Sequence, residues 1–281
     1  MMSRYNLQQR VVVITGATGG LGRGLAHALR AKGARLALLD IDLAKAQALA
    51  HELGDEQVAR AWQADVRSHA NLEQVMNEAA RHFGGIDVVI ANAGITQISP
   101  MVGTSPEAFE RVIDINLTGV WRTLRTALPH VQQRRGYLMA ISSMAAFVHS
   151  PLQSHYTASK AGVWAMCNSI RLEVRHLGVD VGTVHPTFFN TPMMAEVHAD
   201  AAGAKLWGGN KGGIWKMITV DDVVRSVVDG IEERKEAVVV PRQNILIAKA
   251  PGLFRKLAER LGFKQADVVE AIRLAELNGP R

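Results

Sequence analysis

The sequence predicts an α/β fold in which one doubly wound parallel sheet carries helices on both faces. Short runs rich in Val, Ile and Leu alternate with longer helical patterns along most of the 281 residues. The runs VVVIT (11–15) and IDVVIA (86–91) are almost entirely apolar, which is typical of strands buried on both faces. Parallel strands need crossover connections, and these crossovers are nearly always right-handed. The alternation therefore indicates one doubly wound domain.

The expected elements follow one another along the chain. Strands are expected at 10–16, 35–40, 58–65, 86–94, 136–143, 179–186 and 236–241. Helices are expected at 21–33, 43–54, 71–85, about 107–133, 156–177 and 220–234. Residues 1–240 then form the main domain, with a Met- and Trp-rich segment at 187–217. Residues 241–281 form a C-terminal helical extension, in which Leu253, Phe254, Leu257 and Leu261 fall on one helix face.

The composition argues against several classes of protein. Lys and Arg number 32 against 26 Asp and Glu, a net charge of +6, but no long basic run accompanies the surplus. We therefore expect no nucleic acid partner. The single cysteine, Cys167, cannot form an internal disulfide. The N-terminus has no apolar signal region and no apolar run approaches the ~18 residues of a membrane span. A cytoplasmic location is the expectation.

The first predicted strand runs into the glycine-rich turn TGATGGLG (15–22). Gly16, Gly20 and Gly22 are spaced G-x-x-x-G-x-G, and a helix is expected from Leu21. Glycine permits a tight turn and close approach of the backbone to a pyrophosphate, and the helix N-terminus offers free N–H groups. Glycines also build plain structural turns, so the turn alone is weak evidence. Its place between the first strand and the first helix predicts a dinucleotide cradle.

Asp40 ends the second strand, eighteen residues after Gly22. A carboxylate there can bind the ribose 2′-hydroxyl of NAD and would repel the 2′-phosphate of NADP. Ile41 follows, so no adjacent arginine offers that phosphate a partner. We therefore expect NAD, with NADP as the alternative. Arg23 either serves the loop or is a solvated helix residue, and Asp42 is better placed than Asp40 to cap the next helix.

A tyrosine and a lysine stand four residues apart in YTASK (156–160). A helix would place Tyr156 and Lys160 on the same face. The lysine ammonium favours tyrosinate and so lowers the pKa of the phenol from its ordinary value of about 10. A tyrosine tuned in this way can exchange a proton with an alcohol or a ketone. The pair alone could equally be a surface pair, so its neighbours must decide.

Five motifs, taken in order, resemble the short-chain dehydrogenase/reductase family. They are TGATGGLG (15–22), NAG (92–94), Asn116 in INLTG, Ser143 in ISS, and YTASK (156–160). Their order and spacing match over residues 8–195 and more loosely to about 240. The resemblance implies a Rossmann-type fold and an oxidoreductase that moves a hydride between NAD(P) and an alcohol or ketone.

The resemblance also implies a role for each matching residue. Tyr156 would be the general acid/base, and Lys160 would lower its pKa and hold the nicotinamide ribose. Ser143 would polarise the substrate oxygen, and Asn116 would hold a water in a proton relay. Asp65 and Val66 would lie at the adenine, and Thr191 at the nicotinamide carboxamide. The implied cofactor-binding residues are Gly16, Gly20, Leu21, Gly22, Asp40, Asp65, Val66, Asn92, Ala93, Gly94, Tyr156, Lys160 and Thr191.

The sequence departs from the family at HPTFFNTP (185–192), where Thr187 replaces a usual glycine. Backbone approach to the nicotinamide is then in question, and Phe188 or Phe189 can press on the ring. Residues 188–217 are where the family carries its substrate lid. Here the segment offers the apolar side chains Phe188, Phe189, Met193, Met194, Trp207, Trp215 and Met217. We expect a lipophilic secondary alcohol or ketone as substrate, with plain packing or a partner interface as the alternative.

The remaining expectations concern partners and side chains near the site. The family is usually oligomeric, so we expect a homodimer or homotetramer, commonly formed through the helices that carry Asn116 and Tyr156. The basic, amphipathic stretch near 253–263 either packs on its own domain or a second subunit or, as the less favoured option, touches an anionic membrane. His149 and His155 flank the site as loop residues, and no metal is expected. Two alternatives stay open: an NADP-dependent ketone reductase and a non-catalytic dinucleotide sensor.

Overall fold

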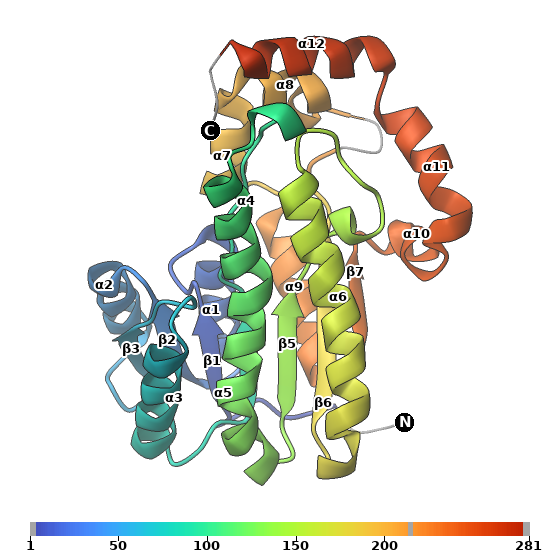
Figure 1. Ribbon diagram of the computed structural model, residues 1–281. Helices are drawn as coiled ribbons and strands as arrows, with labels where there is room; N and C mark the ends of the chain where they lie inside the picture. Colours follow the sequence, from blue (N-terminus) through green and yellow to red (C-terminus); the bar gives the residue numbers. More distant parts are fainter. Residues whose placement is uncertain (1–3, 213–215, 278–281) are drawn as a thin grey trace.

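Seven parallel strands form a single sheet in the computed structural model, which describes residues 4–212 and 216–277 (Figure 1). The strand order is β3-β2-β1-β4-β5-β6-β7. The strands are β1 (Val11–Thr15), β2 (Arg35–Asp40), β3 (Ala59–Gln63), β4 (Val88–Ala91), β5 (Tyr137–Ile141), β6 (Asp180–Pro186) and β7 (Ala237–Val240). This arrangement confirms the predicted doubly wound α/β fold. The order reverses between β1 and β4, the point at which such sheets bind ligands.

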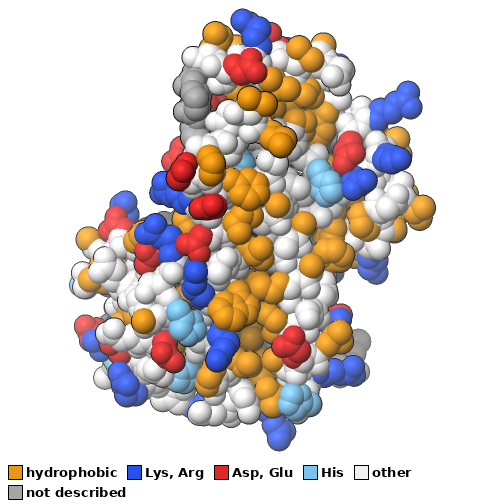
Figure 2. All heavy atoms as spheres, viewed as in Figure 1, with side chains coloured by type: hydrophobic (Ala, Val, Ile, Leu, Met, Phe, Trp, Pro, Cys, Tyr) orange, Lys and Arg blue, Asp and Glu red, His pale blue; other side chains and the backbone are white. Residues whose placement is uncertain are grey.

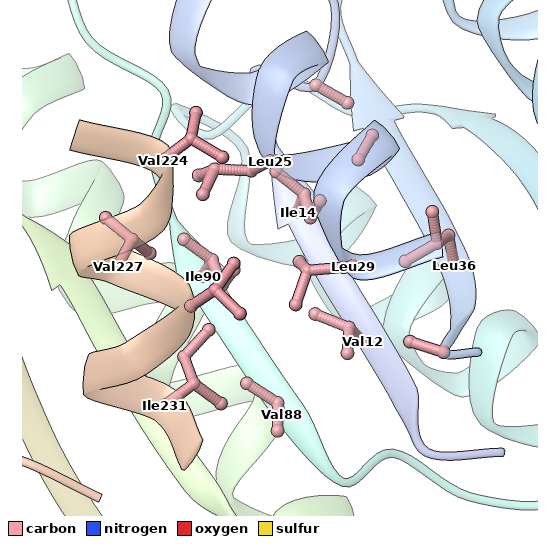
Figure 3. Close-up of a cluster of buried hydrophobic side chains, with 14 of the residues drawn as sticks. Val12, Ile14, Leu25, Leu29, Leu36, Val88, Ile90, Val224, Val227 and Ile231 are labelled. Atoms are coloured by element: carbon pink, nitrogen blue, oxygen red, sulfur yellow. The ribbon is translucent and has the colours of Figure 1, made fainter. Parts of the chain in front are cut away.

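Helices α1 (Gly20–Ala31), α2 (Leu43–Leu53) and α9 (Val220–Glu232) cover one face of the sheet. Their apolar stripes bury Leu25 and Leu29 from α1 and Val227 from α9. Figure 3 shows Leu25 and Leu29 next to Ile14 and Val12 of β1, and Val227 next to Ile90 of β4. Alternate residues of each strand point to opposite faces, so this layer takes every second side chain of the sheet. Burying a large aliphatic side chain in this way contributes roughly 1.5–3 kcal/mol.

The opposite face packs against α3 (His69–Phe83), α5 (Gly119–Gln133) and α6 (Ser154–Val174), which lie in front of the sheet in Figure 1. The intervening strand residues, such as Val11 and Val13 of β1, join this second core. Cys167 is buried there, and burial raises the pKa of its thiol to about 12. The cysteine is therefore an inert packing residue.

The helix expected at about 107–133 is three segments on one axis. α4 (Pro106–Ile113) passes through a π-helical turn, η2 (Asp114–Thr118), into α5. Ser105 caps α4 by accepting a hydrogen bond from the Ala108 amide at 3.1 Å. A π-turn inserts one residue into the helical ladder and is common at functional sites. Here the inserted turn carries Asn116, which is fully buried.

The carboxyl ends of the strands are covered by the segments that follow β6 and β7, which lie outside the regular alternation of strand and helix. α7 (Pro192–Ala199) and α8 (Ala201–Trp207) lie above this edge, and α12 (Gln265–Glu276) crosses over them (Figure 1). The apolar contacts join Leu206 and Trp207 of α8 to Ala271 and Ala275 of α12. α10 (Ile245–Lys249) and α11 (Pro251–Gly262) lead from β7 to α12. The C-terminal helices therefore help to enclose the space above the sheet.

Candidate active site

A cavity of about 660 Å³ opens above the carboxyl ends of the strands, at the switch point between β1 and β4. Its walls hold Tyr156, Lys160 and Ser143 together with most of the predicted cofactor residues. Those residues are Gly16, Gly20, Leu21, Asp40, Asp65, Val66, Asn92, Ala93, Gly94 and Thr191. Gly22 and Asn116 do not line the cavity. The site thus gathers residues from both halves of the chain.

The glycine-rich turn approaches its neighbours too closely for side chains. Gly16 has a positive φ of 63°, and a Cβ there would lie 2.9 Å from the Cα of Ala93. A Cβ on Gly22 would lie 2.3 Å from the Gly16 carbonyl oxygen, so Gly22 serves the packing of α1 against the turn. Gly20 begins α1 and leaves its free N–H groups at the cavity. The turn therefore fits a bound pyrophosphate.

Thr15 and Asn92 lock this turn to the end of β4. The Thr15 hydroxyl accepts hydrogen bonds from the amides of Asn92 (3.0 Å) and Ala93 (3.2 Å). The Asn92 side-chain amide donates to the carbonyl oxygens of Thr15 (3.0 Å) and Gly16 (2.9 Å). Asn92 is thus a support for the cradle as well as a wall of it. Sequence reasoning missed Thr15, although its place at the end of a buried strand was a signal.

Asp40 holds the same turn from the other side. Its carboxylate accepts hydrogen bonds from the amide and the hydroxyl of Thr18 at 2.9 and 2.8 Å, and it lines the cavity while 7% exposed. Asp42, in contrast, caps α2 by accepting from the Lys45 amide at 3.1 Å. Arg23 pairs with Glu52 at 2.6 Å on the surface. A buried anion therefore faces the cavity without a cation beside it in these contacts.

Asp65 and Val66 line the same end of the cavity, beyond β3. The Asp65 carboxylate is in an ion pair with Arg67 at 2.7 Å, and the hydrogen bond from Arg67 holds the pKa of that carboxyl below its usual range. The Asp65 amide donates to the Asn71 side chain at 2.8 Å. This pair presents both a carboxylate and a guanidinium to the cavity wall.

Tyr156 and Lys160 lie in the first two turns of α6, beside the end of β5. The Lys160 ammonium nitrogen lies 5.5 Å from the centre of the Tyr156 ring and donates to the Ile141 carbonyl oxygen at 2.9 Å. Burial lowers the pKa of Lys160 to about 8. Burial raises the pKa of Tyr156, and a hydrogen bond with the Ser143 side chain opposes the rise. Burial is the larger of these two influences, so the net shift is upward, and the lowering by Lys160 stays a prediction.

Ser143 ends the loop after β5 and rests on a histidine that sequence reasoning missed. The Ser143 hydroxyl accepts from the Ala145 amide at 3.1 Å, while its carbonyl oxygen lies 3.3 Å from His185 Nδ1. The other ring nitrogen of His185 lies 2.8 Å from the Thr183 hydroxyl. Burial lowers the pKa of His185 to about 4, so the ring is neutral at pH 7. Nδ1 then donates to the Ser143 carbonyl, and Nε2 accepts from Thr183.

Asn116 reaches the site from the π-turn. Its side-chain oxygen accepts from the Ile95 amide and its side-chain nitrogen donates to the Ile95 carbonyl oxygen, both at 2.8 Å. A Cβ at Gly94 would lie 3.2 Å from the Asn116 side-chain oxygen and 3.6 Å from the Lys160 nitrogen. Asn116 and Lys160 therefore both border the backbone of Gly94. Asn116 braces the loop after β4 against the helices α5 and α6.

Thr187, the residue at which the sequence departs from the family pattern, lines the cavity at the end of β6. Its hydroxyl is buried and has no hydrogen-bond partner among the described residues. Thr191 caps α7 by accepting from the Met194 amide at 3.3 Å, and its methyl group lies 3.0 Å from the position a Cβ would take on Gly20. Together the glycine cradle and the orphaned Thr187 hydroxyl fit a dinucleotide that supplies polar groups to this wall.

The segments that follow β5 give the cavity many apolar side chains. These include Met144, Val148, Phe188, Phe189, Met193, Met194, Val197, Trp207, Ile247, Phe254, Leu257, Ala258, Leu261 and Phe263, and the polar Ser150, Gln153 and Asn244 line the cavity with them. The rings of Phe188 and Trp207 pack together at 5.4 Å between their centres. Gln153 adds a polar group and donates to the Thr96 hydroxyl at 2.9 Å. Helix α11 thus forms one wall of the cavity, a position that the sequence did not predict for it.

Several expected side chains lie outside this cavity. His149 is exposed and His155 is fully buried, where burial lowers its pKa. Met217 does not line the cavity, and Trp215 lies outside the described residues. In residues 4–212 and 216–277, no cluster of three His, Cys, Asp or Glu side chains is placed to hold a metal ion.

Comparison with known proteins connects this geometry to a family. The family profile described as short chain dehydrogenase matches residues 10–202. The 3beta-hydroxysteroid dehydrogenase 1 of Eggerthella lenta is 35% identical over 200 residues, which are 69% of this chain and 76% of that protein. The (-)-trans-carveol dehydrogenase of Rhodococcus erythropolis is 35% identical over 204 residues, 67% of this chain and 74% of that protein.

A solved structure shows the same fold. The crystal structure of gox2181 superimposes with a TM-score of 0.76 and 23% identity, covering 83% of this chain and 95% of that chain. These matches confirm the resemblance drawn from the five motifs. The chain belongs to the short-chain dehydrogenase family, oxidoreductases that bind NAD(P) on a Rossmann-type sheet.

Proposed function

We propose that the protein oxidises a lipophilic secondary alcohol, or reduces the corresponding ketone, with NAD as the favoured cofactor. The observation that carries the proposal is the position of Tyr156 and Ser143, which lie between the cofactor cradle and an apolar cavity wall. The cofactor, when bound, supplies the acceptor or donor of the hydride. The chain itself must then bind the alcohol and move its hydroxyl proton.

Tyr156 is the proposed proton acceptor for alcohol oxidation and the proton donor for ketone reduction. Ser143 makes a hydrogen bond with Tyr156 and can share the substrate oxygen with it. Lys160 contributes positive charge 5.5 Å from the Tyr156 ring, and this charge favours tyrosinate as the proton moves. Asn116 makes hydrogen bonds with both backbone groups of Ile95 and so holds the loop after β4 in place beside Lys160.

NAD is favoured because the carboxylate of Asp40 faces the adenosine end of the cavity. The carboxylate accepts two bonds from Thr18 and has further acceptor capacity for a ribose hydroxyl. A 2′-phosphate would meet a buried negative charge. Arg67 is the cation at this end of the cavity, but it is already in an ion pair with Asp65. NADP-dependent reduction is therefore the second candidate.

The substrate class follows from the apolar compartment beyond Tyr156. Apolar walls remove the hydrocarbon surface of a ligand from water and offer few directional contacts. The size and hydrophobicity of the ligand therefore dominate its recognition. The related hydroxysteroid and carveol dehydrogenases are both named for alicyclic, largely hydrocarbon alcohols. A steroid-like or terpenoid alcohol suits the same kind of space. Gln153 provides a hydrogen-bonding group at its edge.

A substrate screen tests the proposal. Purified protein is incubated with NAD or NADP and a panel of secondary alcohols of increasing size, and the absorbance of reduced nicotinamide is followed. Turnover with large apolar alcohols and NAD is expected. The variant Tyr156→Phe should lose turnover by at least about 100-fold while NADH binding, read by fluorescence, stays near the wild-type value. Absence of turnover with every alcohol and ketone, alongside tight NADH binding, would support a non-catalytic sensor instead.

We further propose that the protein assembles as a homodimer or homotetramer through the α4–α6 face and works in the cytoplasm. Phe109, Trp121 and Leu172 on these helices are between 39% and 66% exposed. Exposed aromatic and leucine side chains of this kind are common at subunit interfaces. Light scattering of the purified protein gives the number of subunits, and a monomer would contradict this proposal.

A further inference from the structure

The C-terminal helix α11 carries a row of exposed leucines. Leu253, Leu257 and Leu261 are 79%, 56% and 65% exposed and stand four residues apart, so they share one helix face. α11 projects from the right edge of the molecule in Figure 1, next to α10. On α10, Ile245 and Leu246 are also 41% and 61% exposed. Together these five side chains define an apolar rim on the extension.

The apolar rim is continuous with the substrate cavity. Leu257 and Leu261 line the cavity and are exposed to solvent as well, so they form its lip. Phe254 and Ala258 lie further round the same helix and face the interior of the cavity. The helix surface therefore stays apolar from the cavity, across the lip, to the outer Leu253.

Basic side chains border the rim. Lys256 and Arg260 are exposed and each precede a lip leucine, which places them about 100° around the helix in a parallel row. Residues 241–264 hold Arg242, Lys249, Arg255, Lys256, Arg260 and Lys264 against the single acid Glu259. This short stretch has a net charge of +5, close to the +6 of the whole chain. Figure 2 shows Lys and Arg side chains along the same right-hand edge.

We propose that α10 and α11 dock on an anionic phospholipid membrane surface, with the apolar rim in the interfacial layer. A leucine row flanked by lysine and arginine is the pattern of helices that lie in the membrane interface. Each basic side chain near such a surface adds to the attraction. A second copy of the chain fits this face less well, because two-fold contact would set one +5 surface against another. No helix in the described ranges is long and apolar enough to cross a membrane, so the contact would be peripheral.

Docking in this orientation would place the cavity lip at the lipid surface. A lipophilic alcohol dissolved in the membrane could then reach Tyr156 without crossing water. This consequence rests on the proposed function, whereas the docking itself does not. The test therefore reads membrane binding directly and does not use turnover.

The experiment is co-flotation of the full-length protein with vesicles. We expect the protein to float with vesicles of phosphatidylcholine and phosphatidylglycerol, to float poorly with phosphatidylcholine alone, and to be released by high salt. Replacing both Lys256 and Arg260 by Gln should lower the partition coefficient by about 25-fold. Leu253→Ser, outside the cavity lining, should lower it by roughly 5- to 20-fold.

Matched controls lie on distant helices. Arg81→Gln with Arg225→Gln removes the same charge from exposed positions on α3 and α9, away from the proposed subunit interface. Val102→Ser removes an exposed aliphatic side chain from the 3-10 helix Met101–Gly103. Neither control should change flotation. Thermal melting of each variant verifies its fold. The proposal is overturned if the wild type stays unbound with both vesicle types, if the controls weaken flotation as much as the rim variants, or if the rim variants change only the oligomer mass in light scattering.

Discussion

The Lys160 ammonium nitrogen lies 5.5 Å from the centre of the Tyr156 ring and donates a hydrogen bond of 2.9 Å to the Ile141 carbonyl oxygen. Lys160 is thus held by the strand end while its charge stays close to the phenol. Its burial is unfavourable for the ammonium form and lowers the pKa to about 8. A buried lysine of this kind makes the free energy of unfolding depend on pH.

Stability without cofactor should therefore rise as the pH increases from about 8 to about 10.5. In this window the unfolded chain binds a proton at Lys160 that the folded chain has released, so raising the pH favours the folded state. The gain amounts to about 3 kcal/mol. Urea unfolding at several pH values measures it. Lys160→Met should remove this part of the slope, whereas Lys249→Met, at an exposed lysine, should leave it unchanged.

Asp40 should control the choice between the two cofactors. Asp40→Ser removes the buried carboxylate, so the ratio of the NADPH to the NADH dissociation constant should fall by about tenfold or more. NADH itself should bind more weakly, because the contacts with Thr18 are lost. Titration by nicotinamide fluorescence gives both constants. Asp42→Ser is the control, since Asp42 caps α2, and an equal change of ratio in that variant would contradict the assignment.

His185 should position Ser143 and make the fold sensitive to acid. Burial depresses its pKa to about 4, so the unfolded chain binds more protons below about pH 6.5 and stability is lost as the pH falls toward 4. The loss approaches about 1.4 kcal/mol per pH unit. His185→Asn keeps a donor for the Ser143 carbonyl but cannot take up a proton in this range. The free energy of unfolding of this variant should therefore depend less steeply on pH than that of the wild type. Unfolding curves between pH 4 and 7 check it.

The same histidine gives a kinetic prediction. His185→Ala leaves the Ser143 carbonyl without its donor, so kcat should fall by about tenfold with a smaller change in KM, and His185→Asn should recover part of the loss. Equal activity of the alanine and asparagine variants would show that the contact has no positioning role.

The Thr187 hydroxyl should lower the stability of the cofactor-free protein and strengthen the binding of the cofactor. Its buried hydroxyl has no partner among the described residues, so Thr187→Val should raise the stability of the cofactor-free protein by about 1 kcal/mol. If the hydroxyl binds the nicotinamide, NADH affinity should fall by roughly 5- to 10-fold. Thr187→Ser retains the hydroxyl and should keep the affinity. Calorimetric melting and NADH titration separate the two effects.

Phe254 should set the size preference of the enzyme from the C-terminal extension. It lines the cavity, so Phe254→Ala should raise KM for large apolar alcohols by about tenfold while short alcohols change little. Leu253→Ala is a matched control on the adjacent, 79% exposed residue. If both variants behave alike with soluble substrates, α11 does not contact substrate. KM values across an alcohol series provide the measurement.

The sequence by itself determined the order of strands and helices, because periodicities of two and about 3.6 residues are local properties of the chain. It also located the glycine turn at the end of β1 and the Tyr156–Lys160 pair on one helix, since both depend on short-range spacing. Asp42 as the cap of α2 is another local feature, and the structure confirms it. The helix at about 107–133 was predicted, but its π-turn was not, because the reason for it is the distant contact of Asn116 with Ile95.

Only the tertiary structure decided which residues meet across the sheet. His185 reaches Ser143 because β5 and β6 pair in parallel with Ile141 opposite Val184, a register that no local pattern reveals. Burial in that fold also raises the pKa of the Tyr156 phenol, an influence that the spacing of Tyr156 and Lys160 along the chain does not reveal. The packing of α12 on α8 places α11 beside the cavity, so that an amphipathic stretch becomes a wall of that cavity.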